Sequence, residues 1–277
     1  METGLILLII IVLLSLAFDY INGFHDSANA IATVVSTRVL SPRTAVIFGA
    51  VLNLVGALLG TEVASTVGKG IVASGAVTMP VVVCALLAAI VWNLITWAKG
   101  LPSSSSHALI GALVGAVLGN SAFNLQDIQW QALSGKVLIP MVASPVTGFV
   151  ISYMVMVALT WWVHQWSLPL INRVFGRLQI VSAGFMALSH GHNDAQKSMG
   201  IIALALFTIY PEKGFQVDTW VILACALAMG LGTLSGGWKI IRTLGTKMIK
   251  LQPIHGFAAE TAASGVIMLA SHYGIPL

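Results

Sequence analysis

The sequence predicts an all-α polytopic membrane protein, and its composition and hydropathy carry the prediction. Only 8% of the 277 residues are charged and 57% are hydrophobic, and the mean hydropathy is +0.94. Soluble domains carry roughly 25% charged residues, so a water-soluble fold is excluded. The apolar runs lack strand-type alternation, so helices must satisfy the backbone polar groups in lipid. The net charge of +4 comes without a dense basic cluster; the expected partner is therefore the lipid bilayer and not a nucleic acid.

Glycine and proline separate the chain into apolar segments, several of them close to the ~20 residues that span a bilayer. We expect membrane segments at 4–40 with a break near 19–27, and at 43–66, 78–98, 103–119, 136–163, 178–209, 219–236 and 255–272. The protein is therefore expected to cross the inner (plasma) membrane several times.

The two halves of the chain share motifs in the same order. Gly23 and Gly191 begin similar motifs 168 positions apart, and Gly100-Leu101-Pro102 recurs as Gly274-Ile275-Pro276 at an offset of 174. Ordered matches at a nearly constant offset predict an internal duplication.

The duplication divides the chain into three parts. We expect a first repeat at 1–135, a connecting transmembrane helix with a cytoplasmic loop at 136–177, and a second repeat at 178–277. The counterpart of the serine-rich segment that follows Pro102 would begin at about Leu277. We therefore expect the second repeat to be incomplete at its C-terminal end.

The basic residues predict the orientation of the halves. Arginine and lysine in short loops favour the cytoplasmic side. All five arginines fall on one side if the helices alternate in direction, whereas Lys69, Lys136 and Lys213 fall on the other. Equivalent loops of the two halves then lie on opposite faces of the membrane. This pattern predicts an inverted-repeat transporter with broken helices and a serine-rich hairpin.

A carboxylate within an apolar segment marks the first repeat. A charge in hydrocarbon is costly and is expected to face an ion, a partner or a cavity, which makes Asp26 a candidate site residue. Asn29 lies three positions on and shares its helix face, and carboxylate and amide oxygens suit a small cation. We expect Gly23 to let the helix unwind and free backbone carbonyls. The alternative is an interhelical hydrogen-bond cluster without an ion.

The second motif holds Asn193, Asp194 and Lys197, and Lys197 stands where the first motif has Asn29. An ammonium group there would neutralise Asp194 and exclude sodium by occupying its charge and space. It could also attract an anion, and a lysine beside a carboxylate suits proton coupling. The alternative for Lys197 is a structural ion pair.

No enzyme chemistry is predicted. His190 and His192 precede Asp194 as a metal-ligand set would, but a spacing of two puts neighbouring members on different helix faces. The serine cluster lacks a base arrangement or a nucleophile elbow. We therefore expect no catalytic residue, no metal centre and no cofactor.

Ser103, Ser104, Ser105 and Ser106 form the candidate anion site. They precede a helix of small residues, so hydroxyls and free N–H groups meet the positive end of a helix dipole. Such an end binds anions. The alternative is a polar loop with a good helix cap.

Glu260 is a further carboxylate within an apolar segment, among small residues that favour close helix contacts. An ion or proton site and a satisfied structural acid are both compatible with it. Glycines at 111, 115 and 119 have the spacing of a helix-packing face, and we expect them to pack against a neighbour.

These motifs resemble those of the inorganic phosphate transporter family, in its bacterial low-affinity permease type. The segment 23–33 looks like the first-repeat signature of that family, 191–197 like the second, and 102–107 like the tip of its first serine-rich hairpin. The resemblance covers nearly the whole chain. It implies an inverted-repeat symporter in which the four serines bind phosphate and Asp26, Asn29 and Asp194 bind or relay the cation.

The resemblance also bears on the coupling ion. Lysine at position 197, where the family often has asparagine, resembles proton-coupled bacterial members that take up a neutral metal–phosphate complex. We therefore expect import of inorganic phosphate, alone or with a divalent metal, by symport with protons. The alternatives are a sodium-coupled phosphate symporter and a sulfate permease of the same fold, since serine hydroxyls alone do not choose between tetrahedral anions. A homodimer is compatible with this prediction.

Overall fold

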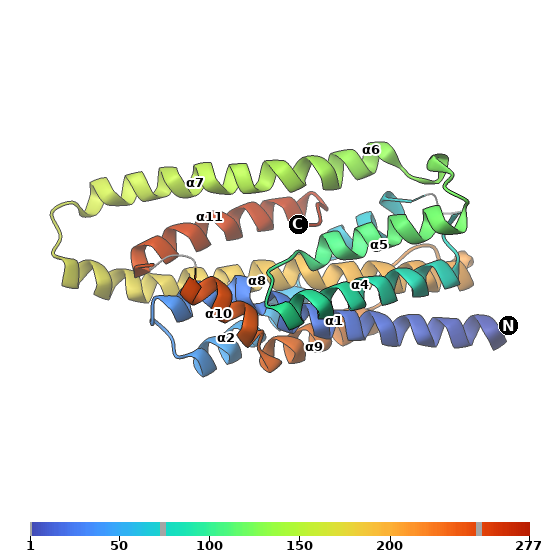
Figure 1. The fold of residues 1–277 in the computed structure, drawn as a ribbon, viewed down its shortest axis with the longest axis horizontal. Helices are drawn as coiled ribbons and strands as arrows, with labels where there is room; N and C mark the ends of the chain where they lie inside the picture. The colour runs from blue at the N-terminus through green and yellow to red at the C-terminus, as the bar shows by residue number, and fades with distance from the viewer. Residues whose placement is uncertain (1, 73–75, 248–250) are drawn as a thin grey trace.

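The computed structural model describes residues 2–72, 76–247 and 251–277, which form an elongated helical bundle (Figure 1). The helices, in chain order, are α1 (Glu2–Ser36), α2 (Pro42–Ala57), α3 (Glu62–Ser65), α4 (Met79–Lys99), α5 (Ser105–Asn120), α6 (Trp130–Leu133), α7 (Ile139–Val163), α8 (Leu168–Ile209), α9 (Thr219–Ser235), α10 (Trp238–Lys247) and α11 (Pro253–His272). Single π-helical turns follow α3 at Thr66–Gly70 and α6 at Ser134–Leu138, and short 3-10 turns lie at Leu125–Asp127 and Pro211–Lys213. Within the described ranges, β pairing is limited to an isolated bridge between Val72 and Ile128.

Each predicted membrane segment contains a helix, so the all-α membrane fold is confirmed. Among the described residues, three helical stretches are long and apolar enough to cross a bilayer, namely Thr3–Ser36, Met79–Lys99 and Trp130–Val163. A fourth candidate span is the pair Pro42–Ala57 and Glu62–Gly70, which is bent by 64°. The 42-residue helix α8 carries the polar second motif at its centre, which lowers its hydropathy.

The break in the helices lies elsewhere than expected. α1 runs without interruption through Gly23, so the expectation that Gly23 unwinds this helix is wrong. The bend lies instead between α2 and α3. A Cβ atom at Gly23 would lie 2.4 Å from the carbonyl oxygen of Met229 on α9. The glycine therefore serves close approach of two helix backbones.

Two helix pairs, each with one helix from either half of the chain, are in close backbone contact. Gly23 of α1 and Gly232 of α9 each lie against the backbone of the other helix, and Gly56 of α2 and Gly191 of α8 do the same. A Cβ atom at Gly191 would lie 2.1 Å from the carbonyl oxygen of Asn53 on α2. Figure 1 shows α1 and α8 running in opposite directions along the bundle. The first helix of each half therefore packs against the second helix of the other half.

Glycines in the left-handed backbone region follow two long helices. Gly100, with φ +67°, comes directly after α4, and Gly274, with φ +65°, comes two residues after α11. Both glycines begin the repeated Gly-x-Pro motif, and only glycine adopts this backbone region at little cost. In the part of the chain that the structure describes, nothing lies within 4 Å of a Cβ atom built at the glycines of α5. The expected packing face at positions 111, 115 and 119 is therefore wrong.

The ends of the bundle agree with the predicted grouping of basic residues. The loop between α1 and α2 and the start of α8 lie at the left in Figure 1, whereas the chain beyond α5 and the end of α8 lie at the right. The first group of segments carries arginines, and the second carries Lys136 and Lys213.

Candidate functional site

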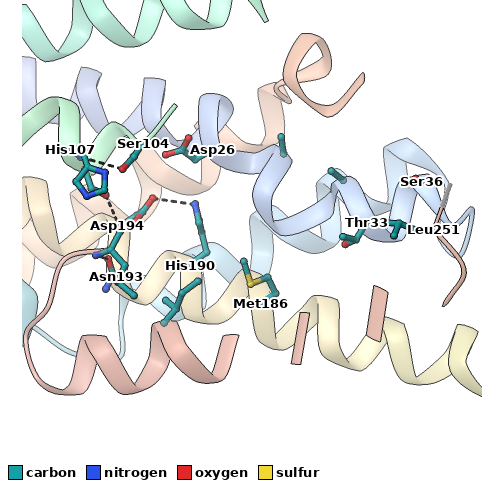
Figure 2. A pocket seen from close by; sticks show the side chains of 15 residues that line it. Asp26, Thr33, Ser36, Ser104, His107, Met186, His190, Asn193, Asp194 and Leu251 are labelled. Atoms are coloured by element: carbon teal, nitrogen blue, oxygen red, sulfur yellow. Dashed lines mark hydrogen bonds and ion pairs between the residues drawn. The ribbon is translucent and has the colours of Figure 1, made fainter. Parts of the chain in front are cut away.

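A cavity of about 590 Å³ lies where the two aspartate motifs meet the start of α5. Asp26 of α1, Ser104 and Ser106 at the start of α5, and Asn193 and Asp194 of α8 are among its lining residues. Figure 2 shows the carboxylates of the two motifs on either side of this space. The pairing of the two motifs that the sequence suggested is thus present in three dimensions.

Asp194 lies at the centre of a buried charge network. Its Oδ1 accepts a hydrogen bond from Lys197 Nζ at 2.5 Å, and its Oδ2 accepts one from Asn22 Nδ2 at 3.3 Å. His190 Nε2 lies 3.1 Å from the same Oδ2. Lys197 is fully buried and Asp194 is 5% exposed. A buried carboxylate is tolerated where it is paired in this way, and removal of the partner leaves an uncompensated charge.

Lys197 also joins the second motif to the start of α5. Its ammonium group donates to Ser106 Oγ and, at 2.9 Å, to the carbonyl oxygen of Leu277. Ser106 donates to the same carbonyl at 2.8 Å. One cation therefore holds a carboxylate, a hydroxyl and a backbone carbonyl together.

The residue before each aspartate belongs to a hydrogen-bond chain that reaches the Gly-x-Pro motif of its own half or the residue after it. In the first half, His25 Nδ1 lies 2.7 Å from Asp26 Oδ1, and its Nε2 lies 2.9 Å from Thr96 Oγ1. Ser103 Oγ donates to the same Thr96 hydroxyl at 3.2 Å. His25 and Ser103, which are far apart in the sequence, are thus linked through one threonine of α4.

In the second half, Asn193 occupies the position that corresponds to His25. Its Nδ2 donates to Ser271 Oγ of α11 at 2.7 Å and to the carbonyl oxygen of Ile275 at 3.1 Å. Its Oδ1 accepts from the backbone N–H of Leu277 at 3.1 Å. The amide therefore fixes the segment after α11 beside the cavity.

The four serines divide into two pairs. Ser104 is the N-cap of α5 and accepts from the backbone N–H of His107 at 3.2 Å, and Ser104 and Ser106 both line the cavity. Ser103 bonds to Thr96 instead, and the fully buried Ser105 is not among the lining residues. The backbone N–H groups of Ser105 and Ser106 belong to the first helical turn, where no intrahelical partner exists.

Glu260 lies outside the cavity lining but is connected to it. The carboxylate, 3% exposed, accepts from the hydroxyls of Thr33 and Ser182 and from Gln179 Nε2 at 3.3 Å. Thr33 is itself a lining residue. Glu260 is thus a well-bonded acid between α1, α8 and α11.

Comparison with known proteins identifies the family. The sequence pattern that describes the phosphate transporter family matches residues 22–277. The chain belongs to the phosphate transporter family. The resemblance inferred from the motifs is therefore confirmed, and the protein is a membrane protein of a transporter family.

Bacterial proteins are among the relatives of this phosphate transporter family member. It is 46% identical to a probable low-affinity inorganic phosphate transporter of Rhizobium meliloti, over 98% of this chain and 81% of the relative. Proteins of the same description are 45% identical in Bacillus subtilis, over 100% of this chain and 83% of the relative, and 44% identical in Mycobacterium tuberculosis. The match spans all of this chain but 66% of the M. tuberculosis protein. The fold matches a solved structure described as the sodium-dependent phosphate transporter, with a TM-score of 0.87, 24% identity, and coverage of 98% of this chain and 85% of that chain.

Sequence reasoning missed one residue of this family member's site. Ligand atoms of Asp26, His190 and Asp194 all lie within 4.8 Å of one another, an arrangement that could hold a cation. The sequence argument rested on the spacing of two between His190 and His192, whereas His190 and Asp194 are four apart and share a helix face. Asn29 was also assigned to the cation, and its side chain lies outside the described residues.

Proposed function

We propose that this family member imports inorganic phosphate by symport with protons, and that the central cavity receives the anion. Family membership and the description of its relatives as probable low-affinity inorganic phosphate transporters support phosphate as the substrate. The observation that carries the proposal is the bridge that Lys197 makes between Ser106 and Asp194 in the wall of the cavity.

The start of α5 supplies the groups that an oxyanion needs. Ser104 and Ser106 line the cavity, and free N–H groups at a helix N-terminus bind tetrahedral anions. The Lys197 ammonium adds a positive charge beside them. In this proposal Ser105 contributes its backbone N–H, and Ser103 holds the segment in place through Thr96.

The same bridge favours a proton over sodium as the coupling ion. The Lys197 ammonium already occupies one side of Asp194 and supplies the charge that a sodium ion would bring. We propose that Asp26 and Asp194 relay the proton and that Glu260, linked to the cavity through Thr33, assists. Asn193 serves to hold the segment after α11, and Asn29 remains a proposed cation ligand.

A metal–phosphate complex is a second candidate form of the substrate. Two carboxylates and an imidazole nitrogen within 4.8 Å of one another are ligands that divalent metals accept. A metal that enters with phosphate would be met there by Asp26, His190 and Asp194, beside the proposed anion site.

Uptake of radiolabelled phosphate tests the proposal. The full-length protein would be expressed in cells that lack their own phosphate transporters, with sodium replaced by choline, with an uncoupler, or with excess sulfate. Uptake that survives sodium removal, ignores sulfate and stops with the uncoupler is expected. A requirement for sodium would refute proton coupling, and competition by sulfate would change the substrate. Added EDTA separates the free anion from the metal complex.

Asp194→Asn tests the central carboxylate. It should abolish uptake while the protein still reaches the membrane, because the amide neither relays a proton nor pairs with Lys197. Asp127→Asn, at a half-buried position in the 3-10 turn Leu125–Asp127 outside the cavity lining, is the matched control and should leave uptake unchanged. Full uptake by Asp194→Asn would exclude the assigned role.

A further inference from the structure

A buried carboxylate lies apart from the cavity on α1. Asp19 is fully buried and is not among the cavity-lining residues. Its Oδ1 accepts a hydrogen bond from Ser198 Oγ of α8 at 2.6 Å. Its Oδ2 has no hydrogen-bond partner, and no basic nitrogen lies within 4.0 Å of it, among the described residues.

Asp19 extends the polar face of α1 that carries the first motif. Ser15, Asp19, Asn22 and Asp26 follow one another at helical spacing, and all four are buried. Asn22 donates to Asp194 Oδ2 at 3.3 Å. Ser15 Oγ, Asp19 Oδ2 and Asn22 Oδ1 all have unused hydrogen-bonding capacity within the described chain. Buried polar groups on successive turns of α1 therefore lead from Asp194 to Asp19.

The surroundings of Asp19 favour its neutral form. A buried carboxylate normally has a cationic partner or several donors, whereas this one has the Ser198 hydroxyl and, beside it, the weakly donating Cys225 thiol. The titratable and charged groups that face it are the Cys225 thiol of α9 and, at longer range, Asp194 and Lys197 of α8. The Lys197 ammonium is bound to Asp194. A proton on Oδ2 removes the charge that nothing nearby balances.

The pair of Asp19 and Ser198 occurs once in the duplicated structure. At the 168-residue offset of the motifs, Asp19 corresponds to Ala187 and Ser198 to Ala30. The pair is therefore not half of a symmetric site shared by both repeats. It joins the first helix of one half to the first helix of the other, beside the motif in which lysine replaces asparagine.

We propose that Asp19 is a proton-binding residue of the transport cycle, distinct from the substrate cavity. A proton binds at Oδ2 to form a neutral carboxyl group, and the same proton leaves to the other side of the membrane. This inference rests on the proposed proton symport.

The test compares net accumulation with exchange. Full-length protein would be reconstituted in liposomes, and labelled phosphate would be followed with and without an inward proton gradient. Asp19→Asn imitates the protonated group and cannot release a proton, so gradient-driven accumulation should fall at least tenfold. Phosphate–phosphate exchange needs no net proton movement and should stay within twofold of the wild type. Glu212→Gln, a matched loss of charge in the exposed turn Pro211–Lys213, should leave both activities within twofold.

The outcomes separate the inference from the proposed function. Accumulation retained by Asp19→Asn, or exchange lost from a folded Asp19→Asn protein, would overturn the role of Asp19. Wild-type accumulation that ignores the proton gradient would overturn proton symport itself. If Asp19→Asn does not fold, Ser198→Ala is the deciding variant, because it removes the hydrogen bond to Asp19. The pH profile of accumulation should then move by about half a pH unit or more, while exchange persists. An unmoved profile would exclude Asp19.

Discussion

Removal of the Lys197 ammonium should strongly reduce transport, because this group bridges Asp194 and Ser106 beside the cavity. Lys197→Met keeps an unbranched apolar side chain but takes the partner from Asp194 and the donor from Ser106. Breaking a buried ion pair by removing one member costs about 3–5 kcal/mol. Because each 1.4 kcal/mol is a factor of ten, apparent phosphate affinity or uptake should fall by roughly two to three and a half orders of magnitude.

Initial uptake rates over a range of phosphate concentrations measure this effect. Lys213→Met is the matched control, since Lys213 is exposed above the ring of Tyr210 and its loss should change rates less than twofold. The double variant Asp194→Asn/Lys197→Met removes both charges and should unfold at a higher temperature than Lys197→Met without regaining transport. Uptake by Lys197→Met within twofold of the wild type would refute the argument.

Three further substitutions test other contacts. Gly23→Ala pushes α1 away from α9 and should cost about 1–3 kcal/mol of stability, measured as a lower unfolding temperature in detergent. Gly115→Ala lies on an open helix face and should leave the unfolding temperature unchanged. The same unfolding temperature for both variants would refute close packing at Gly23. Ser106→Ala should raise the KM for phosphate about tenfold, and an unchanged KM would remove its hydroxyl from the anion site. Glu260→Gln should reduce gradient-driven uptake at least tenfold if this carboxyl relays protons, and unchanged uptake would assign it a structural role.

The sequence was sufficient for features whose signals are local. Asp26 and Asp194 could be found because a carboxylate in an apolar segment is costly wherever that segment packs. Ser104 could be assigned to a helix start because capping depends on a few neighbouring positions. The apolar helices could be predicted because hydropathy is also a local property of each segment.

Features that depend on distant partners could not be predicted in this way. Gly23 was expected to unwind a helix, but its role is set by the backbone of α9, about 200 positions along the chain. Thr96 carries no local sign that it links His25 to Ser103. His190 comes close to Asp26 only because α8 packs on α1. The four-residue spacing between His190 and Asp194 was nevertheless a usable signal in the sequence.

The reciprocal glycine contacts limit how such a transporter can change shape. The backbones of α1 and α9 are in close contact, as are those of α8 and α2. A displacement of either half would therefore move a helix of the other half as well. A cycle that opens the cavity to alternate sides therefore cannot treat the halves as two independent rocking bodies. The segments beyond α4 and α11 begin at Gly100 and Gly274, and the side chains of Asn193 and Lys197 on α8 bond to them. These two segments are where an alternating gate can swing while the frame that carries both carboxylates stays fixed.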